Sequence, residues 1–117
     1  MNLNRGHRIT AAEALEQLPA ADGRHFITLF EHGTLQVEMY APQGRDLQQP
    51  HKRDEVYVVV RGSGTFFCDG TRTPFGTGDF LFVPAGIEHR FEDFSDDFAV
   101  WVFFYGLEGG EAGSPAE

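Results

Sequence analysis

Two segments of the sequence carry side chains that could bind a metal ion. In the first, Gln49, His51 and Glu55 lie two and four residues apart. Side chains at these spacings point to the same side of an extended chain, so the three can share a face. The second segment places His89 just after a Pro-Ala-Gly turn. If the chain brings the two segments together, two imidazoles and a carboxylate converge.

This set of donors suits a divalent first-row metal ion. Two histidines and one carboxylate with open coordination positions are typical of non-haem iron and related ions, and Gln49 could add an amide oxygen as a fourth ligand. Such a cation attracts anionic or chelating oxygen groups and acts on them as a Lewis acid. The other three histidines, His7, His25 and His32, lie outside both segments. We interpret them as structural or solvated.

The elements that must position these residues are mostly short strands. The pattern Thr10-x-x-Glu13 is typical of a capping box and predicts one helix that ends before Pro19. Beyond Gly23, alternating or apolar runs separated by glycine and proline indicate strands. One early strand is expected between His25 and His32, and the others at 34–41, 55–61, 65–68, 71–75, 79–83, 88–94 and 98–105.

Composition narrows the class of protein. The chain has 117 residues, enough for one domain, and a net charge of −9, which disfavours nucleic acid and membrane surfaces as partners. With a single cysteine, Cys68, it cannot form an internal disulfide. It begins without a secretory signal pattern and has no apolar run long enough to span a membrane, so the cytoplasm is the expected compartment.

Seven or eight short strands favour a closed antiparallel architecture, with a jelly-roll barrel as the best single choice. The strand at 55–61 is apolar on both faces. Tyr57 and Val59 share the face of Glu55, and Phe91 shares that of His89, so these three are predicted to line the ligand pocket beside the metal. The opposite face, with Val56, Val58 and Val60, needs a cover, which the N-terminal segment or a second subunit could provide.

The second segment is similar to a motif of the cupin family. Gly78-x5-Pro84-x-Gly86-x2-His89 matches that motif in full, with Asp93 where the family usually has asparagine. In the family this stretch supplies a metal-binding histidine. The resemblance therefore implies that His89 is a ligand.

The first segment matches the other cupin motif with two departures. His51-x3-Glu55-x6-Gly62 fits, but Gln49 replaces the first histidine of the family's pair, and the leading glycine, Gly44, lies one residue late. The resemblance implies His51 and Glu55 as metal ligands. Gln49 could bind the metal as well, which would resemble type I phosphomannose isomerases, cupins that bind zinc through glutamine, histidine, glutamate and histidine. Alternatively, a water molecule takes the place of Gln49 at the metal.

The resemblance also implies the organisation of the chain. We expect an all-β cupin double-stranded β-helix over residues 24–105, preceded by a segment with a short helix (1–23) and followed by a mobile tail (106–117). Small cupins resemble one another in dimerising by sheet-to-sheet packing, so a homodimer is expected. The implied cofactor is a divalent ion: zinc, iron, nickel or manganese.

Three functions are compatible with such a site. The first is a metal-dependent, dioxygenase-like enzyme that acts on a small organic substrate. The second is a sugar isomerase or epimerase that polarises a carbonyl group, and the third is a non-catalytic module that binds or stores a small ligand. Apart from the ligands, the sequence offers no obvious general base, because Tyr57 is a weak candidate: a phenol ordinarily has a pKa of about 10. This favours chemistry carried out at the metal.

Overall fold

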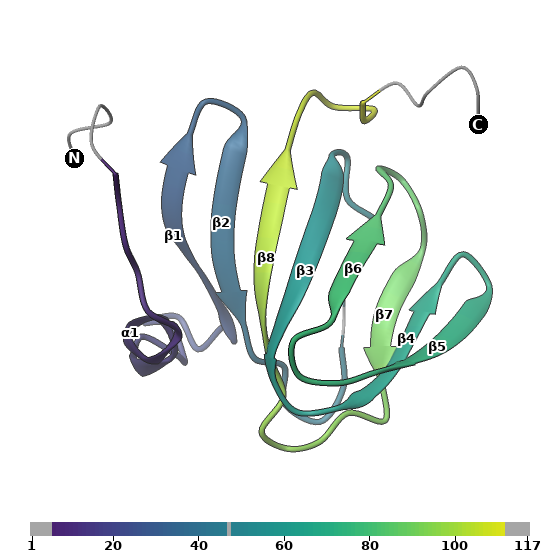
Figure 1. Ribbon diagram of the computed structural model, residues 1–117, viewed down its shortest axis with the longest axis horizontal. Coiled ribbons are helices and arrows are strands. Elements are labelled where there is room, and N and C mark those ends of the chain that lie inside the picture. Colours follow the sequence, from purple (N-terminus) through teal and green to yellow (C-terminus); the bar gives the residue numbers. More distant parts are fainter. Residues whose placement is uncertain (1–5, 47, 112–117) are drawn as a thin grey trace.

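Two antiparallel sheets form the part of the chain that the computed structural model describes, residues 6–46 and 48–111. The larger sheet has the strand order β1-β2-β8-β3-β6 and the smaller one β5-β4-β7 (Figure 1). In chain order the elements are α1 (Ala11–Glu16), β1 (Phe26–His32), β2 (Leu35–Tyr40), β3 (Asp54–Arg61), β4 (Gly64–Cys68), β5 (Thr71–Phe75), β6 (Phe80–Val83), β7 (His89–Glu92) and β8 (Ala99–Tyr105). The predicted all-β cupin fold is confirmed.

The N-terminal helix has the predicted capping box. The Thr10 hydroxyl accepts from the backbone N–H of Glu13 at 3.1 Å, and the Glu13 carboxylate accepts from the Thr10 N–H at 3.2 Å. The helix packs on the outer face of the larger sheet, where Ala14, Met39 and Ala99 are fully buried together. It therefore supplies part of the cover that this face needs.

Strand register decides which side chains of β2 face inward. Gln36 pairs with Phe104 of β8, which pairs with Glu55 of β3. In the next row, Glu38, Val102 and Tyr57 are aligned in the same way. Directly opposed residues share a face of a sheet. The polar side of β2 thus lies on the same inner face as Glu55, while its apolar side faces outward.

An aromatic cluster fills much of the space between the sheets. Phe91 of β7 is its centre, with ring centroids 4.7 Å from Phe98, 4.8 Å from Tyr57 and 5.4 Å from Phe75. These edge-to-face contacts suit aromatic quadrupoles. Val59 lies in the same core, 2% exposed.

The turns between strands depend on specific glycines. At the end of β3, Gly62 has φ +91°, and a Cβ there would lie 2.6 Å from the Ser95 hydroxyl and 2.7 Å from Cα of Phe98. Only glycine fits this position. The Asp69-Gly70 hairpin is as predicted, with φ of 49° and 82°, as a tight hairpin turn requires.

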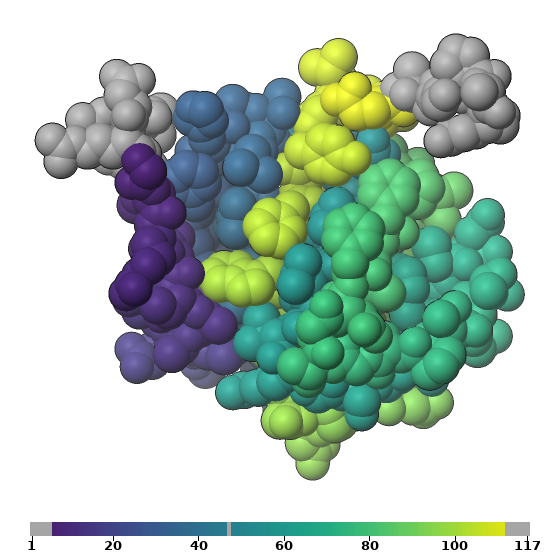
Figure 2. All heavy atoms as spheres, in the orientation of Figure 1, coloured from purple at the N-terminus to yellow at the C-terminus, as the bar shows by residue number. Residues whose placement is uncertain are grey.

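The outer face of the larger sheet is only partly covered. Phe80 and Phe82 of β6 are 66% and 43% exposed, and they lie opposite Val58 and Val56 of β3. Figure 2 shows aromatic rings of β6 and β8 on the surface of this face.

The end of the chain that can be described contacts the barrel. Gly109 N–H donates to the Lys52 carbonyl at 2.7 Å, and Glu111 N–H donates to the Asp54 carboxylate at 2.8 Å. The remainder of the predicted mobile tail, residues 112–117, lies outside the described residues. Within residues 6–46 and 48–111, no helix is long and apolar enough to cross a membrane.

Candidate metal site

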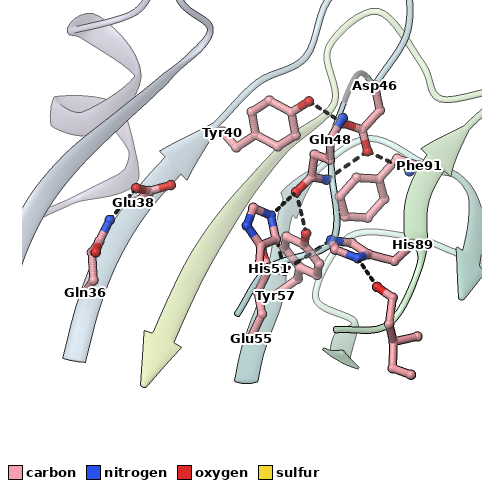
Figure 3. A network of polar contacts seen from close by, with 11 residues as sticks. Gln36, Glu38, Tyr40, Asp46, Gln48, His51, Glu55, Tyr57, His89 and Phe91 are labelled. Carbon is pink, nitrogen blue, oxygen red and sulfur yellow. Dashed lines mark hydrogen bonds and ion pairs between the residues drawn. The ribbon is translucent and has the colours of Figure 1, made fainter. Parts of the chain in front are cut away.

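His51, Glu55 and His89 converge from three places in the fold. His51 precedes β3, Glu55 is the second residue of β3 and His89 opens β7. Each offers a ligand atom within 4.8 Å of the other two. The Glu55 Oε1 atom lies 3.2 Å from His89 Nε2 and 3.8 Å from His51 Nε2 (Figure 3). The three residues predicted from spacing are therefore brought together.

Backbone contacts hold the two segments beside each other. The Gly86 N–H donates to the His51 carbonyl at 2.7 Å, and the Ala85 N–H donates to the Asp54 carboxylate at 3.0 Å. Gly86 has φ +80°, a conformation that suits glycine at the turn before His89. The Pro-Ala-Gly turn thus places His89 against the start of β3.

Buried acceptors face one another at the centre of the cluster. Glu55 is 1% exposed, and neither of its carboxylate oxygens has a hydrogen-bond donor among the described residues. His89 Nδ1 lies 2.9 Å from the Ile87 carbonyl, which can only accept, so Nδ1 carries the proton. The lone pair of Nε2 then points at the carboxylate, and Nε2 too lacks a partner. Because buried polar groups without partners are costly, this arrangement calls for a cation.

The titration of His89 follows from the same contacts. Burial alone lowers the pKa of the imidazole, but the adjacent Glu55 carboxylate and the Ile87 carbonyl outweigh it and raise the pKa.

The geometry fits a first-row metal ion. An ion about 2.0–2.2 Å from each nitrogen or oxygen ligand requires ligand atoms roughly 3–4.4 Å apart. The separations of 3.2 and 3.8 Å within the cluster lie in this range. The hydrogen bond from His89 to Ile87 also fixes the ring orientation, as is usual for metal-binding histidines.

The glutamine beside the cluster is Gln48, one residue earlier than the predicted Gln49. Gln49 is exposed. The Gln48 Oε1 atom lies 3.2 Å from His51 Nε2 and accepts from the Tyr57 hydroxyl at 2.9 Å. The sequence contains two adjacent glutamines, and the chain before β3 does not alternate as a strand does. The structure therefore places the amide oxygen of Gln48, and not that of Gln49, where it could coordinate a metal ion.

Asp46 holds the Gln48 side chain in place. This carboxylate is 9% exposed and accepts from Gln48 Nε2 at 2.8 Å, from the Phe91 N–H at 2.9 Å and from the Tyr40 hydroxyl at 2.6 Å. Burial and the bond to Asp46 raise the pKa of Tyr40, so its hydroxyl remains a donor. Burial and the charge of Glu55 likewise raise the pKa of Tyr57. No motif marked Asp46, whose partner Phe91 lies 45 residues away.

A cavity of about 550 Å³ opens on the cluster. Val102 and Phe104 form its apolar floor. Glu55 and His51 line one side of the cavity, and the polar side chains of β2 line the opposite side. His25, interpreted from sequence as structural or solvated, also lines it, together with two arginines, Arg24 and Arg45.

The three residues predicted to line the pocket lie close behind it. Tyr57 reaches the site through its hydroxyl, which donates to Gln48. All three, Tyr57, Val59 and Phe91, are packed in the hydrophobic core, and none of them is part of the lining of this cavity.

The chain belongs to the cupin family. The family model for the cupin domain matches residues 36–109. An uncharacterized protein of Streptomyces coelicolor is 33% identical over 94 residues, which cover 79% of this chain and 90% of that one.

Two further relatives carry functional names. Acireductone dioxygenase of Rhodopseudomonas palustris is 44% identical over 45 residues, only 35% of this chain and 27% of that enzyme. Among solved structures, a protein of Ralstonia eutropha provisionally named a mannose-6-phosphate isomerase has a TM-score of 0.56 and 27% identity, over 70% of this chain and 83% of that one.

Proposed function

We propose that this cupin binds a divalent first-row metal ion through His51, Glu55 and His89, with the Gln48 amide oxygen as the fourth protein ligand. The observation that supports it most is the set of buried acceptors, both oxygens of Glu55 and Nε2 of His89, that face one another without a donor. Zinc, iron, nickel and manganese all accept this mixture of nitrogen and oxygen donors.

A metal assay tests the ligand assignment. Protein purified without chelators or a metal-affinity column should carry a single divalent ion per chain, measured by elemental analysis. His51→Ala and His89→Ala should lose it while retaining the β-sheet circular dichroism spectrum. His32→Ala, an exposed histidine outside the cluster, is the matched control and should keep the metal. Wild type that takes up no ion even after reconstitution would contradict the proposal.

We propose that the metal centre serves a dioxygenase-like reaction on a small organic substrate. The similarity to acireductone dioxygenase supports this choice. A bound ion supplies Lewis-acid and oxygen-activating chemistry. The residues of this chain would orient the substrate: the apolar floor of the cavity excludes water, and the hydroxyl of Tyr57 holds the amide of Gln48 in position.

A second candidate is an isomerase or epimerase, which the likeness to the Ralstonia eutropha protein favours. The third candidate, a module that only binds or stores a ligand, needs the same metal and cavity. Oxygen-electrode measurements separate them. Iron- or nickel-loaded protein that consumes dioxygen with a small substrate supports the dioxygenase, turnover without dioxygen supports the isomerase, and tight binding without turnover supports the module.

We also propose that two copies of the chain associate through the outer face of the larger sheet. The exposed rings of Phe80 and Phe82 adjoin Val56 and Val58, and together they make an apolar surface that a second copy could cover by sheet packing. Sedimentation should give a dimer of the 13.1 kDa chain. Phe82→Glu should give a monomer, whereas Leu107→Glu, also exposed, should not. A monomeric wild type at micromolar concentration would contradict this proposal.

A further inference from the structure

Glu38 presents a second carboxylate to the cavity, away from the metal cluster. It is 9% exposed and lines the cavity from β2. Its Oε2 atom accepts from Gln36 Nε2 at 2.7 Å and from the Thr28 hydroxyl at 3.0 Å. None of the described residues donates to its other oxygen, Oε1. Figure 3 shows Glu38 on β2, separated from the cluster by β8.

Neighbouring side chains fix the orientation of this carboxylate. Arg53 donates from Nη2 to Gln36 Oε1 at 2.9 Å and from Nη1 to the Thr34 carbonyl at 2.6 Å. The Gln36 amide is thus held at its oxygen by a guanidinium, and its nitrogen is aimed at Glu38. A carboxylate held through one oxygen leaves the other free to accept a hydrogen bond from a ligand.

Strand register places Glu38 two strands away from the metal cluster. Glu38 and Tyr57 are aligned across Val102, and Gln36 and Glu55 are aligned across Phe104. Each pair is separated across the sheet by two strand spacings, about 10 Å, and Glu38 is offset from Glu55 by two residues along the sheet, so the backbones of Glu38 and Glu55 are at least this far apart. The floor between the two polar sides consists of Val102 and Phe104. Along this line the cavity has a metal-binding end, an apolar middle and an acceptor end, and Arg24, His25 and Arg45 also belong to its lining.

We propose that Glu38 binds the far end of the ligand and selects small molecules that carry metal-binding oxygens at one end and a hydrogen-bond donor, a hydroxyl or an ammonium group, about 10 Å away. This inference rests on the proposed metal site and specifies its ligand class. A hydrogen bond to a buried carboxylate is charge-assisted and stronger than a neutral one. Glu38 acts here as a specificity-determining residue.

Three hydroxamate probes test the inference. Hexanohydroxamic acid chelates a metal through two oxygens, and its analogues with a terminal hydroxyl or a terminal ammonium group add only the donor. Binding to the metal-loaded protein is measured by calorimetry. At least one donor probe should bind about tenfold tighter than the plain probe, the factor that corresponds to about 1.4 kcal/mol. The better of the two donors identifies the ligand as an alcohol or an amine.

Variants assign the gain to Glu38. Glu38→Gln should remove the advantage of the ammonium probe, and Glu38→Leu, which has no acceptor, should remove that of both donor probes. The plain probe should bind every variant as it binds wild type, which also shows that the variants are folded. Glu16→Gln, an exposed glutamate of α1, makes the same change in charge and should keep the wild-type pattern.

The outcomes separate this inference from the proposed function. If the plain probe binds metal-loaded wild type but neither donor probe gains, the metal site stands and the role of Glu38 is wrong. A gain that persists in Glu38→Leu also overturns the inference. Failure of the plain probe to bind overturns the open metal site, and the inference with it.

Discussion

The carboxylate of Asp46 accepts a hydrogen bond of 2.8 Å from Nε2 of Gln48, and this bond decides which atom of the Gln48 amide faces the proposed metal site. With the nitrogen held by Asp46, the carbonyl oxygen is directed at His51 and Tyr57. Asp46 itself is fixed by the Phe91 N–H, so β7, which supplies His89, also orients the glutamine.

The first prediction concerns this bond. Asp46→Asn replaces one carboxylate oxygen by an NH₂ group, which cannot accept from the donors around residue 46. Gln48 should therefore lose its fixed orientation. Changes of this kind next to metal ligands weaken metal affinity by about 10–100-fold. Competition with a chelating dye measures the affinity. Asp96→Asn, an exposed aspartate, is the control and should bind as wild type does. Unchanged affinity in Asp46→Asn would show that Gln48 does not contribute.

The second prediction concerns the metal-free protein. Glu55→Gln removes a buried charge that lacks a donor and introduces an N–H that can donate to Nε2 of His89. We expect the metal-free variant to be more stable than metal-free wild type by about 0.5–1.5 kcal/mol, the net value of one hydrogen bond. Urea denaturation in chelator measures this difference.

In the presence of metal the order should reverse, because wild type gains stability from the bound ion and Glu55→Gln does not. A metal-free variant less stable than wild type would argue that the proton shared with His89 already satisfies the carboxylate.

The third prediction is a pH dependence at the surface. Arg72 and Arg90 donate to Glu92 at 2.8 and 2.7 Å and lower the pKa of its carboxyl group. A lowered pKa in the folded state stabilises the protein above the pKa of the unfolded chain, and this contribution is lost as the pH falls through the folded value. Glu92→Gln should therefore melt below wild type at neutral pH, and the difference should vanish in acid.

The control for this experiment is Glu31→Gln, because Glu31 is exposed on β1. Its melting temperature should follow wild type at every pH. A difference between Glu92→Gln and wild type that stays constant into acid would mean that the ion pairs are not its source.

The fourth prediction separates backbone strain from steric overlap at glycine. Gly70→Ala places a Cβ at φ +82° in open space and should cost about 1–2 kcal/mol. Gly62→Ala meets a similar strain at φ +91° and adds overlap with Ser95 and Phe98, which should cost about 1–3 kcal/mol more. Thermal denaturation of both variants measures the difference. Equal losses would mean that the end of β3 can move to make room.

The sequence predicted the strands and the three clustered residues because both depend on local patterns. His51 and Glu55 belong to one short stretch, and the turn before His89 has a recognisable Pro-Ala-Gly signature. The placement of Gln49 did not follow, because the two-residue alternation holds only inside a strand and β3 begins at Asp54.

Features that depend on tertiary contacts could not be predicted from local sequence patterns. The alternation in β2 was evident, but it does not tell which face is interior. The helix that covers Met39 decides this, and it turns Glu38 toward the cavity. Asp46 was missed for a similar reason, since its partner Phe91 lies 45 residues away.

The contacts of residues 109–111 have a further consequence. Gly109 and Glu111 donate to Lys52 and Asp54, which lie between the proposed ligands His51 and Glu55. If residues 51–55 become more rigid, the hydrogen bonds from these two amides should open less often. Their rate of hydrogen exchange should therefore slow when the ion binds, which makes this end of the chain a built-in reporter of metal occupancy.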